Sequence, residues 1–226
     1  MADLPRPVRR YFEAVLEPGQ RPVRSVRLTQ CGEFRPGGVD DPWKPMTATQ
    51  DYSVDPPGFV WDARVEIAPF LPVRVVDAYE SGRGSLRAHL LSTIPVASSD
   101  PGPELNEGEL LRYLGEAVWF PTALLPDAGV EWTAVDEGSA RATIRDGETT
   151  ASLVFHLDDE GLVKRVTAAE RYRQEDGDYA PWTGHFGEYE RRDGMALPSK
   201  AAVEWNLSEG DCQYWRARLE SVDYRY

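Results

Sequence analysis

The segment LLRYLGEAVWFPTALLP, residues 110–126, places an acidic side chain among aromatic ones. Glu116 follows Tyr113 and precedes Trp119 and Phe120. A carboxylate enclosed by apolar side chains has a raised pKa, and it can act as an acid, a base or an anchor for a polar group of a ligand. The alternative is an ordinary surface pair with Arg112 at i,i+4, which stabilises a helix by only about a few tenths of a kcal/mol.

Asp77 is the second candidate carboxylate. In PVRVVDAYES, strand alternation places it on the inward, apolar face with Val75, while Arg74 and Glu80 point away. A buried carboxylate must be paired or hydrogen-bonded, because its desolvation is costly. A structural role therefore predicts Arg83 or Arg87 as its partner, and an acid–base role is the alternative.

A histidine and a tyrosine also share a strand face. In APWTGHFGEYE, His185 and Tyr189 are four residues apart, and such a pair near a carboxylate could move protons at neutral pH. If the protein is an enzyme, we expect its catalytic group to be Glu116, Asp77, His185 and Tyr189. A structural role for His185 is the alternative, since no companion motif accompanies it.

Large amphipathic side chains are candidates for the walls of a binding site. They are equally typical of a core, because a buried tryptophan is more often a packing residue than a platform on which a ligand stacks. Trp205 also falls on an inward position, as do the polar Gln30 and Glu170, whereas His89 and His156 fall on outer faces. The residues expected to contact a ligand are Trp61, Tyr113, Trp119, Phe120, Gln50 and Trp182.

Several motifs that carry chemistry are missing from the sequence. It contains no HExxH, no CxxC, no G-x-S-x-G and no glycine-rich loop between a strand and a helix. We therefore expect no metal and no cofactor. Cys31 and Cys212 are expected to be free thiols.

The elements that must position these residues are mostly strands. Alternation over residues 26–28, 46–52, 59–67, 71–80 and 83–94 predicts one antiparallel meander, and short turns separate a second one from residue 131 to 225. A helix over 4–16 precedes the first meander. A central helix over 106–125 lies between them, after a loop at 95–104, with Asn106 and Glu109 as a capping box.

The wheel of the central helix has an apolar stripe for packing on a sheet and an opposite face with Tyr113, Glu116, Trp119 and Phe120. Pro121 should kink the helix. About 10–12 strands must curl or close to hide their edges. We predict a single domain, 1–226, of mainly β (α+β) class: a curved antiparallel sheet or open barrel wrapped around the central helix.

The overall charge and the absence of long apolar runs limit the classes of partner that the protein can bind. The net charge is −13, from 38 acidic and 25 basic residues, which argues against binding to nucleic acid or to an anionic membrane. No apolar run approaches the ~18 residues of a membrane span, and the start shows no signal peptide. We expect a cytoplasmic bacterial protein, with a homodimer through an open sheet edge as a possibility.

Together the segments DPPGFVWDARV, DAYESGRGSL, GELLRYLGEAVWFPTALLP and PWTGHFGEYERRDGMALPSKAAVEWNL resemble a bacterial family of unknown function, over about residues 4–224. EAVWFPTALLP is the most specific of them. The order of elements also resembles the lipoprotein-carrier fold, an open half-barrel around a helix. That resemblance implies a concave apolar cavity and no particular activity.

Two classes of function follow. The first is a binding protein for a hydrophobic small molecule, with Trp61, Trp119 and Trp182 as walls and Glu116 and Asp77 orienting a polar group. The second is a cofactor-independent acid–base enzyme, an isomerase or cyclase, in the same cavity. A purely structural or partner-binding module would instead have a solid core.

Overall fold

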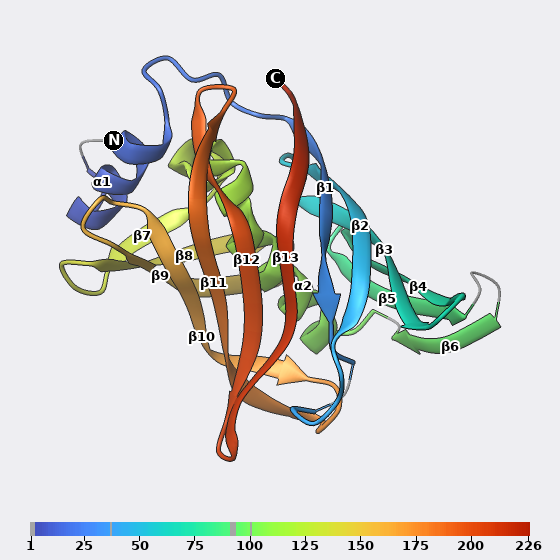
Figure 1. The fold of residues 1–226 in the computed structure, drawn as a ribbon. Coiled ribbons are helices and arrows are strands. Elements are labelled where there is room, and N and C mark those ends of the chain that lie inside the picture. Colours follow the sequence, from blue (N-terminus) through green and yellow to red (C-terminus); the bar gives the residue numbers. More distant parts are fainter. Residues whose placement is uncertain (1–2, 37, 91–93, 100) are drawn as a thin grey trace.

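In the part of the chain that the structure describes, thirteen antiparallel strands form one sheet that curls around a central helix (Figure 1). The computed structural model describes residues 3–36, 38–90, 94–99 and 101–226. The prediction of a mainly β fold with a curved sheet around one helix is confirmed, with one strand more than the upper bound expected from the sequence.

The chain forms two meanders, one on each side of the central helix. The first contains β1 Ser25–Phe34, β2 Lys44–Ser53, β3 Gly58–Ala68, β4 Leu71–Glu80, β5 Arg83–Leu90 and β6 Ile94–Ser99. The second contains β7 Glu131–Ala134, β8 Ser139–Asp146, β9 Thr149–Leu157, β10 Val163–Arg173, β11 Asp178–Arg192, β12 Met195–Leu207 and β13 Gly210–Arg225. β6 occupies much of the segment that the sequence pattern predicts as a loop.

The two meanders are joined by their outermost strands in sequence. β1 pairs with β13 from Ser25 opposite Arg225 to Phe34 opposite Trp215. The order of strands is therefore β6-β5-β4-β3-β2-β1-β13-β12-β11-β10-β9-β8-β7, with β6 and β7 at the two ends. The sheet is a half-barrel whose concave side holds the helix (Figure 1).

Alternation explains why one face of each strand is buried. In β2, Met46, Ala48, Gln50 and Tyr52 are buried, whereas the residues between them are exposed or half-buried. A period of two sends successive side chains to opposite faces of a sheet. Gln50 thus lies on the same buried face as its apolar neighbours, where its amide needs a hydrogen-bond partner.

The central helix α2, Pro103–Glu116, begins and ends earlier than the predicted range of 106–125. Proline stands at its first position, where the missing N–H costs nothing. After Glu116 the chain continues as three 3₁₀ turns, Ala117–Trp119, Pro121–Leu124 and Pro126–Ala128. Proline at the start of the second and third turns cannot donate a helical hydrogen bond, so the α-helix does not continue.

The predicted capping box is wrong. Gly102 precedes the helix and no side chain caps it, so Asn106 and Glu109 already lie inside the helix. Asn106 Oδ1 instead accepts a hydrogen bond from the Gly84 N–H at 2.8 Å, which ties α2 to β5. Glu109 is buried beside the sheet.

The N-terminal helix α1, Arg6–Val15, buries Val8, Tyr11, Phe12 and Val15. It lies at the β7 side of the half-barrel (Figure 1). Phe12 meets Trp132 edge-on, with ring centroids 6.4 Å apart. The helix therefore extends the core at the end of the second meander.

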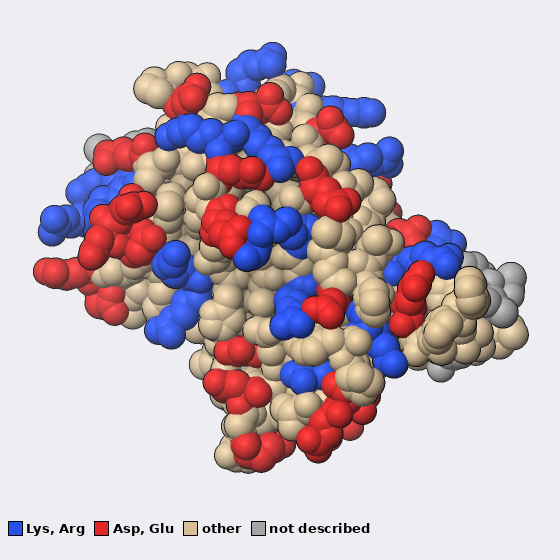
Figure 2. Space-filling model, viewed as in Figure 1, with Lys and Arg blue, Asp and Glu red and all other residues tan. Residues whose placement is uncertain are grey.

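Acidic and basic side chains are interspersed on the outer face that Figure 2 shows. Several of them are paired across strands: Arg216 with Glu33, and both Lys200 and Arg218 with Glu188. Each of these three basic residues is thus paired with a carboxylate of a neighbouring strand.

Candidate functional site

A pocket of about 550 Å³ lies between α2 and the concave side of the sheet. Its volume is within the range of small-molecule sites, about 300–1,000 Å³. Side chains from both meanders line it, so the curl of the whole sheet creates it. Its apolar lining includes Trp61, Val65, Val73, Val75, Leu86, Trp119, Trp182, Phe186, Val203, Trp205 and Trp215.

Two of the tryptophan walls are fixed by hydrogen bonds at their polar ends. Trp61 Nε1 donates to Gln30 Oε1 at 3.1 Å, and Trp182 Nε1 donates to Tyr214 OH at 3.0 Å. Both indoles are almost fully buried. An indole whose N–H is satisfied in this way contributes its apolar ring to a wall at no polar cost.

Arg112 lies at the centre of a buried ionic cluster. Its Nε donates to Glu116 Oε1 at 2.9 Å, and its Nη1 donates to Asp77 Oδ2. The guanidinium also stacks over Phe59 and Trp61, with its Cζ 4.8 and 5.1 Å from the ring centroids. The partner of Asp77 is therefore Arg112 of the helix, and the predicted Arg83 or Arg87 is wrong.

Glu116 accepts three hydrogen bonds. Besides Arg112, Gln50 Nε2 donates to its Oε2 at 2.8 Å and Tyr52 OH donates to the same oxygen at 2.9 Å. The i,i+4 pair with Arg112 exists, as one sequence-based interpretation predicted. It lies inside the pocket wall, however, because each of the two side chains is only 16% exposed.

Glu109 is the carboxylate that faces this cluster without a partner. It is 5% exposed, and its Oε2 has no hydrogen bond within the described part of the structure. Burial raises the pKa of Glu109 to about 8, reinforced by the charges of Asp77 and Glu116 and opposed by Arg112 and Arg171. Glu109 is thus a carboxyl group whose pKa lies well above that of an ordinary glutamate.

Asp77 is hydrogen-bonded to Arg112 through one of its two carboxylate oxygens, and its pKa is raised above the ordinary value. Burial raises its pKa, while Arg112 and Arg171 lower it. Its Oδ1 is buried and, like Glu109 Oε2, has no hydrogen-bond partner among the described residues. The cluster consequently presents two carboxylate oxygens that no protein donor satisfies.

A second guanidinium reaches the pocket from β10. Arg171 stacks over Trp182 at 4.9 Å and over Trp205 at 5.7 Å. It also donates to the Gly108 carbonyl at 3.3 Å and to Tyr214 OH at 3.4 Å. Both arginines of the site are therefore held by aromatic faces as well as by hydrogen bonds.

A family model matches residues 2–224, nearly the whole chain. The chain belongs to DUF6920, a family of unknown function. This confirms the resemblance to a family of unknown function that EAVWFPTALLP indicated. No curated protein matches the chain.

Two solved structures resemble this DUF6920 chain at low identity. The LolA superfamily protein NE2245 from Nitrosomonas europaea is 11% identical, with a TM-score of 0.48 over 97% of this chain and 92% of that one. The β-barrel-like DUF1849 protein from Brucella abortus is 10% identical, with a TM-score of 0.30 over 91% and 99% of the two chains. At TM-scores below 0.5 neither structure bears on the contents of the pocket.

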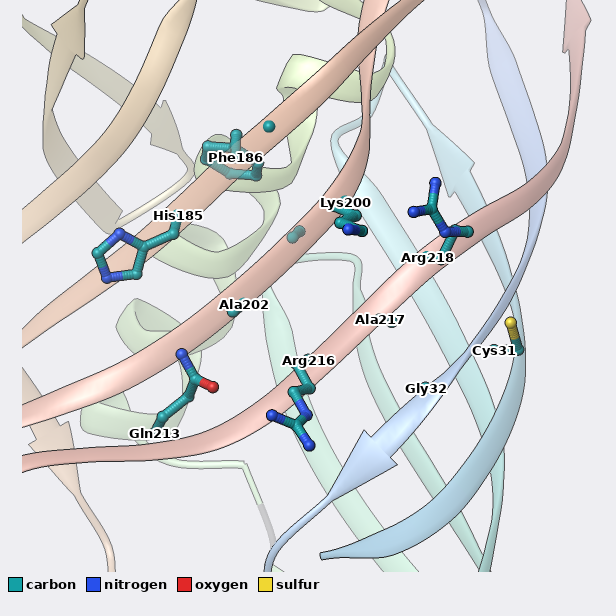
Figure 3. Close-up of a pocket in the computed structure, with 12 residues that line it drawn as sticks. Cys31, Gly32, His185, Phe186, Lys200, Ala202, Gln213, Arg216, Ala217 and Arg218 are labelled. Carbon is teal, nitrogen blue, oxygen red and sulfur yellow. The ribbon is translucent and has the colours of Figure 1, made fainter.

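The structure of the DUF6920 chain does not bring the four predicted catalytic residues together. Asp77 and Glu116 share Arg112, but His185 projects from the opposite, outer face of the sheet (Figure 3). There it is hydrogen-bonded to Glu204 Oε1 at 2.8 Å and is 42% exposed. Tyr189 OH donates to the Val163 carbonyl at 2.7 Å, outside the lining of the pocket.

His185 borders a second and more open depression of about 450 Å³ on that outer face. Figure 3 shows it over β11, β12, β13 and β1, with Lys200, Arg216 and Arg218 around it. Small residues form its floor, among them Gly32, Ala202 and Ala217. The depression exists because these strands carry few large side chains here.

Two predicted wall residues of this DUF6920 chain belong to the core instead. Tyr113 and Phe120 are almost completely buried and pack against each other, with ring centroids 5.8 Å apart. Tyr113 lies beside Leu110 and Leu114 on the helix. Phe120 follows the change to 3₁₀ turns, where a period of 3.6 no longer predicts direction. Gln50 is absent from the lining of the pocket and donates a hydrogen bond to Glu116, which lines it.

The strand predictions for minor polar residues had mixed outcomes. Gln30 and Gln50 are buried, as predicted. Glu170 is exposed, because the register of β10 shifts between Ala168 and Arg171 and reverses the alternation. His89 and His156 are half-buried.

Within residues 3–36, 38–90, 94–99 and 101–226 there is no group of three His, Cys, Asp or Glu side chains that could hold a metal ion. The helices described for the chain are all too short or too polar to cross a bilayer. Cys31 and Cys212 are free thiols.

Sequence reasoning missed two residues of the site. Glu109 carried a signal, since an acidic residue one turn before Arg112 falls on the same helix face as Glu116, but that signal was interpreted as a cap. Arg171 carried none, because only the bulge in β10 turns it inward.

Proposed function

We propose that the pocket binds a hydrophobic or amphipathic small molecule. The observation that carries this proposal is the pocket of about 550 Å³, whose walls are apolar and aromatic and whose few polar groups converge on one ionic cluster. Binding sites for small molecules have this composition, because apolar walls supply affinity and a few placed polar groups fix orientation.

The proposal predicts that filling the pocket abolishes binding. Val75 lines the pocket, whereas its neighbour Val76 lies on the outer face between Asp62 and Arg87. We expect Val75→Trp to weaken the binding of an environment-sensitive hydrophobic dye by about tenfold or more, since the indole occupies the space of the ligand. Fluorescence titration of purified protein measures the effect.

The matched control is Val76→Trp, which adds the same side chain one residue away. It should change dye affinity by less than about twofold. Equal weakening by both variants, or no weakening by Val75→Trp, would show that the dye binds elsewhere.

Native mass spectrometry of the purified chain, followed by denaturing extraction, identifies a resident ligand. We expect a stoichiometric apolar molecule that disappears in Val75→Trp and remains in Val76→Trp. A bare mass for the wild type, together with a failure to bind the dye, would contradict the proposed function.

A cofactor-independent acid–base enzyme, an isomerase or cyclase, is the second candidate function. The observation that favours it is Glu109, a carboxyl group in the pocket wall with a pKa of about 8 and a free oxygen. A group that titrates near the working pH is suited to moving a proton. In this mechanism Glu109, with Asp77 and Arg112 beside it, replaces the predicted pair of His185 and Tyr189.

Solvent exchange separates the two functions. An enzyme of this kind, incubated with its extracted ligand in D₂O, should introduce deuterium into the ligand or convert it to an isomer. A carrier should return the ligand unchanged. Glu160→Gln, an exposed change in the turn between β9 and β10, is the control that should preserve any turnover.

A further inference from the structure

Two buried acceptor atoms in the wall of the pocket point to the polar group of its ligand. Asp77 Oδ1 and Glu109 Oε2 have no hydrogen-bond donor in the part of the chain that the structure describes, and both residues line the pocket. Buried polar atoms in folded proteins are nearly always satisfied, so each exception requires an explanation. A ligand that donates hydrogen bonds would satisfy both.

The two guanidinium groups of the cluster, by contrast, have part of their donors engaged. Arg112 donates to Asp77 and Glu116, and Arg171 donates to the Gly108 carbonyl and to Tyr214. Each guanidinium also lies over aromatic rings. A ligand carboxylate would place a further negative charge beside the carboxyl groups of Asp77, Glu109 and Glu116.

The charges of the ionic cluster also favour a ligand that carries a positive charge. Three carboxyl groups, those of Asp77, Glu109 and Glu116, face two guanidinium groups, those of Arg112 and Arg171. With all five ionised, at a pH above the pKa of Glu109, the cluster lacks one positive charge. Buried charges are normally paired, so a cation in the pocket would complete the set.

We infer that the ligand is an amphipathic amine, whose ammonium group donates to Asp77 Oδ1 and Glu109 Oε2 while its apolar part packs along Trp61, Val75 and Trp182. An ammonium group offers three donors and no acceptor, which matches what the cluster lacks. The inference deepens the proposed function and rests on it.

Binding of an ammonium group must depend on pH through Glu109. The charged groups that face Glu109 are Asp77 on β4, Arg112 and Glu116 on α2, and Arg171 on β10. Glu109 pairs with the amine only after losing its proton, and its pKa is about 8. Affinity for the amine should therefore rise as the pH increases from 6.5 through 8 and level off about one pH unit above that pKa. An alkylamine itself stays charged over this range, since its pKa is near that of lysine, about 10.4.

Three probes with the same twelve-carbon chain test the inference: dodecylamine, dodecanol and dodecanoate. Each is titrated below its micellar concentration against the protein carrying the hydrophobic dye, and displacement is measured from pH 6.5 to 8.5. We expect dodecylamine to bind about tenfold or more tightly than dodecanol at pH 8, with dodecanoate the weakest. Only dodecylamine should gain affinity with rising pH.

Glu109→Gln keeps the shape of the side chain and removes its charge. It should weaken dodecylamine by about tenfold or more, leave dodecanol within about twofold, and remove the pH dependence of dodecylamine binding. The matched control is Glu160→Gln, which removes the same charge from an exposed turn. It measures how much of the loss comes from the general attraction between a positively charged amine and a chain of net charge −13. Thermal melting of both variants verifies that they fold.

Three results would overturn the inference: tightest binding of dodecanoate, equal binding of dodecylamine and dodecanol, or equal effects of Glu109→Gln and Glu160→Gln. In each of these cases the pocket still binds a twelve-carbon chain, and the proposed function stands. If the dye and all three probes fail to bind, the proposed function is wrong, and the inference that rests on it is wrong as well.

Discussion

Replacing Arg112 with methionine is expected to lower the free energy of unfolding by about 3–5 kcal/mol at pH 7. Methionine retains much of the packing of the side chain but leaves Asp77 and Glu116 without the cation to which both are hydrogen-bonded. Removing one partner of a buried ion pair is far costlier than removing an exposed one, because the remaining charge stays desolvated. In a chain of this size the midpoint of thermal unfolding should fall by about 10 °C.

The control is Arg27→Met, which breaks the pair of Arg27 with Asp51 across β1 and β2. Those two side chains are 65% and 48% exposed, so water replaces the lost contact and the midpoint should change little. The deficit of Arg112→Met should also shrink as the pH falls, since burial raises the pKa of Asp77 and its stranded carboxylate then becomes neutral. Equal midpoints for the two variants at pH 7 would contradict the central role of Arg112.

Glu109→Gln should stabilise the ligand-free protein. Burial, with Asp77 and Glu116 as further contributors, raises the pKa of Glu109 from an ordinary value of 4.5 to about 8. The folded state therefore binds a proton that the unfolded state releases between these two values, and stability falls as the pH rises through that range. At 1.36 kcal/mol for each pH unit, glutamine should be more stable by about 3 kcal/mol at pH 7 and by about 5 kcal/mol above pH 8.

Urea unfolding at pH 4, 7 and 9 measures this difference. The two proteins should have nearly equal stability at pH 4, where glutamate is protonated in both states, and should diverge as the pH increases. Glu160→Gln should follow the wild type at all three values. A Glu109→Gln variant that is less stable than the wild type at pH 7 would show that the ionised carboxylate is satisfied in the folded protein.

The expectation for Glu109 describes a site in which stability is lost for binding. Residues that bind ligands are often poor choices for the stability of the empty protein. A glutamate that destabilises the ligand-free chain and strengthens the binding of an amine would be such a residue.

The sequence predicted the fold because the signals for it are local. Alternation in β2 and β3 is regular, with Trp61, Ala63 and Val65 all buried, and the short turns between strands leave antiparallel neighbours as the only arrangement. A sheet this wide has to curl, and the central helix then fills its concave side. The positions of Trp61, Asp77, Glu116, Trp119 and Trp182 in the pocket wall follow from the same pattern.

The site could not be predicted in full because its contacts are not local. The pair of Asp77 and Arg112 joins a strand to a helix, and no spacing rule connects them. A single bulge in β10 exchanged Glu170 for Arg171 on the inward face, since a shift of one residue reverses every side chain beyond it. The prediction that His185 belongs to the site was wrong for a related reason. Its neighbour Phe186 takes the inward position on β11.

The pairing of β1 with β13 has a consequence for the chain during its synthesis. Ser25 and Arg225 are neighbours in the sheet, yet one leaves the ribosome long before the other. At about 5–20 residues per second, the first meander waits roughly 10–40 s with one edge of β1, the edge away from β2, unpaired. An unpaired strand edge invites pairing with other chains. We therefore expect the nascent first half to depend on chaperones, which cover that edge until β13 emerges.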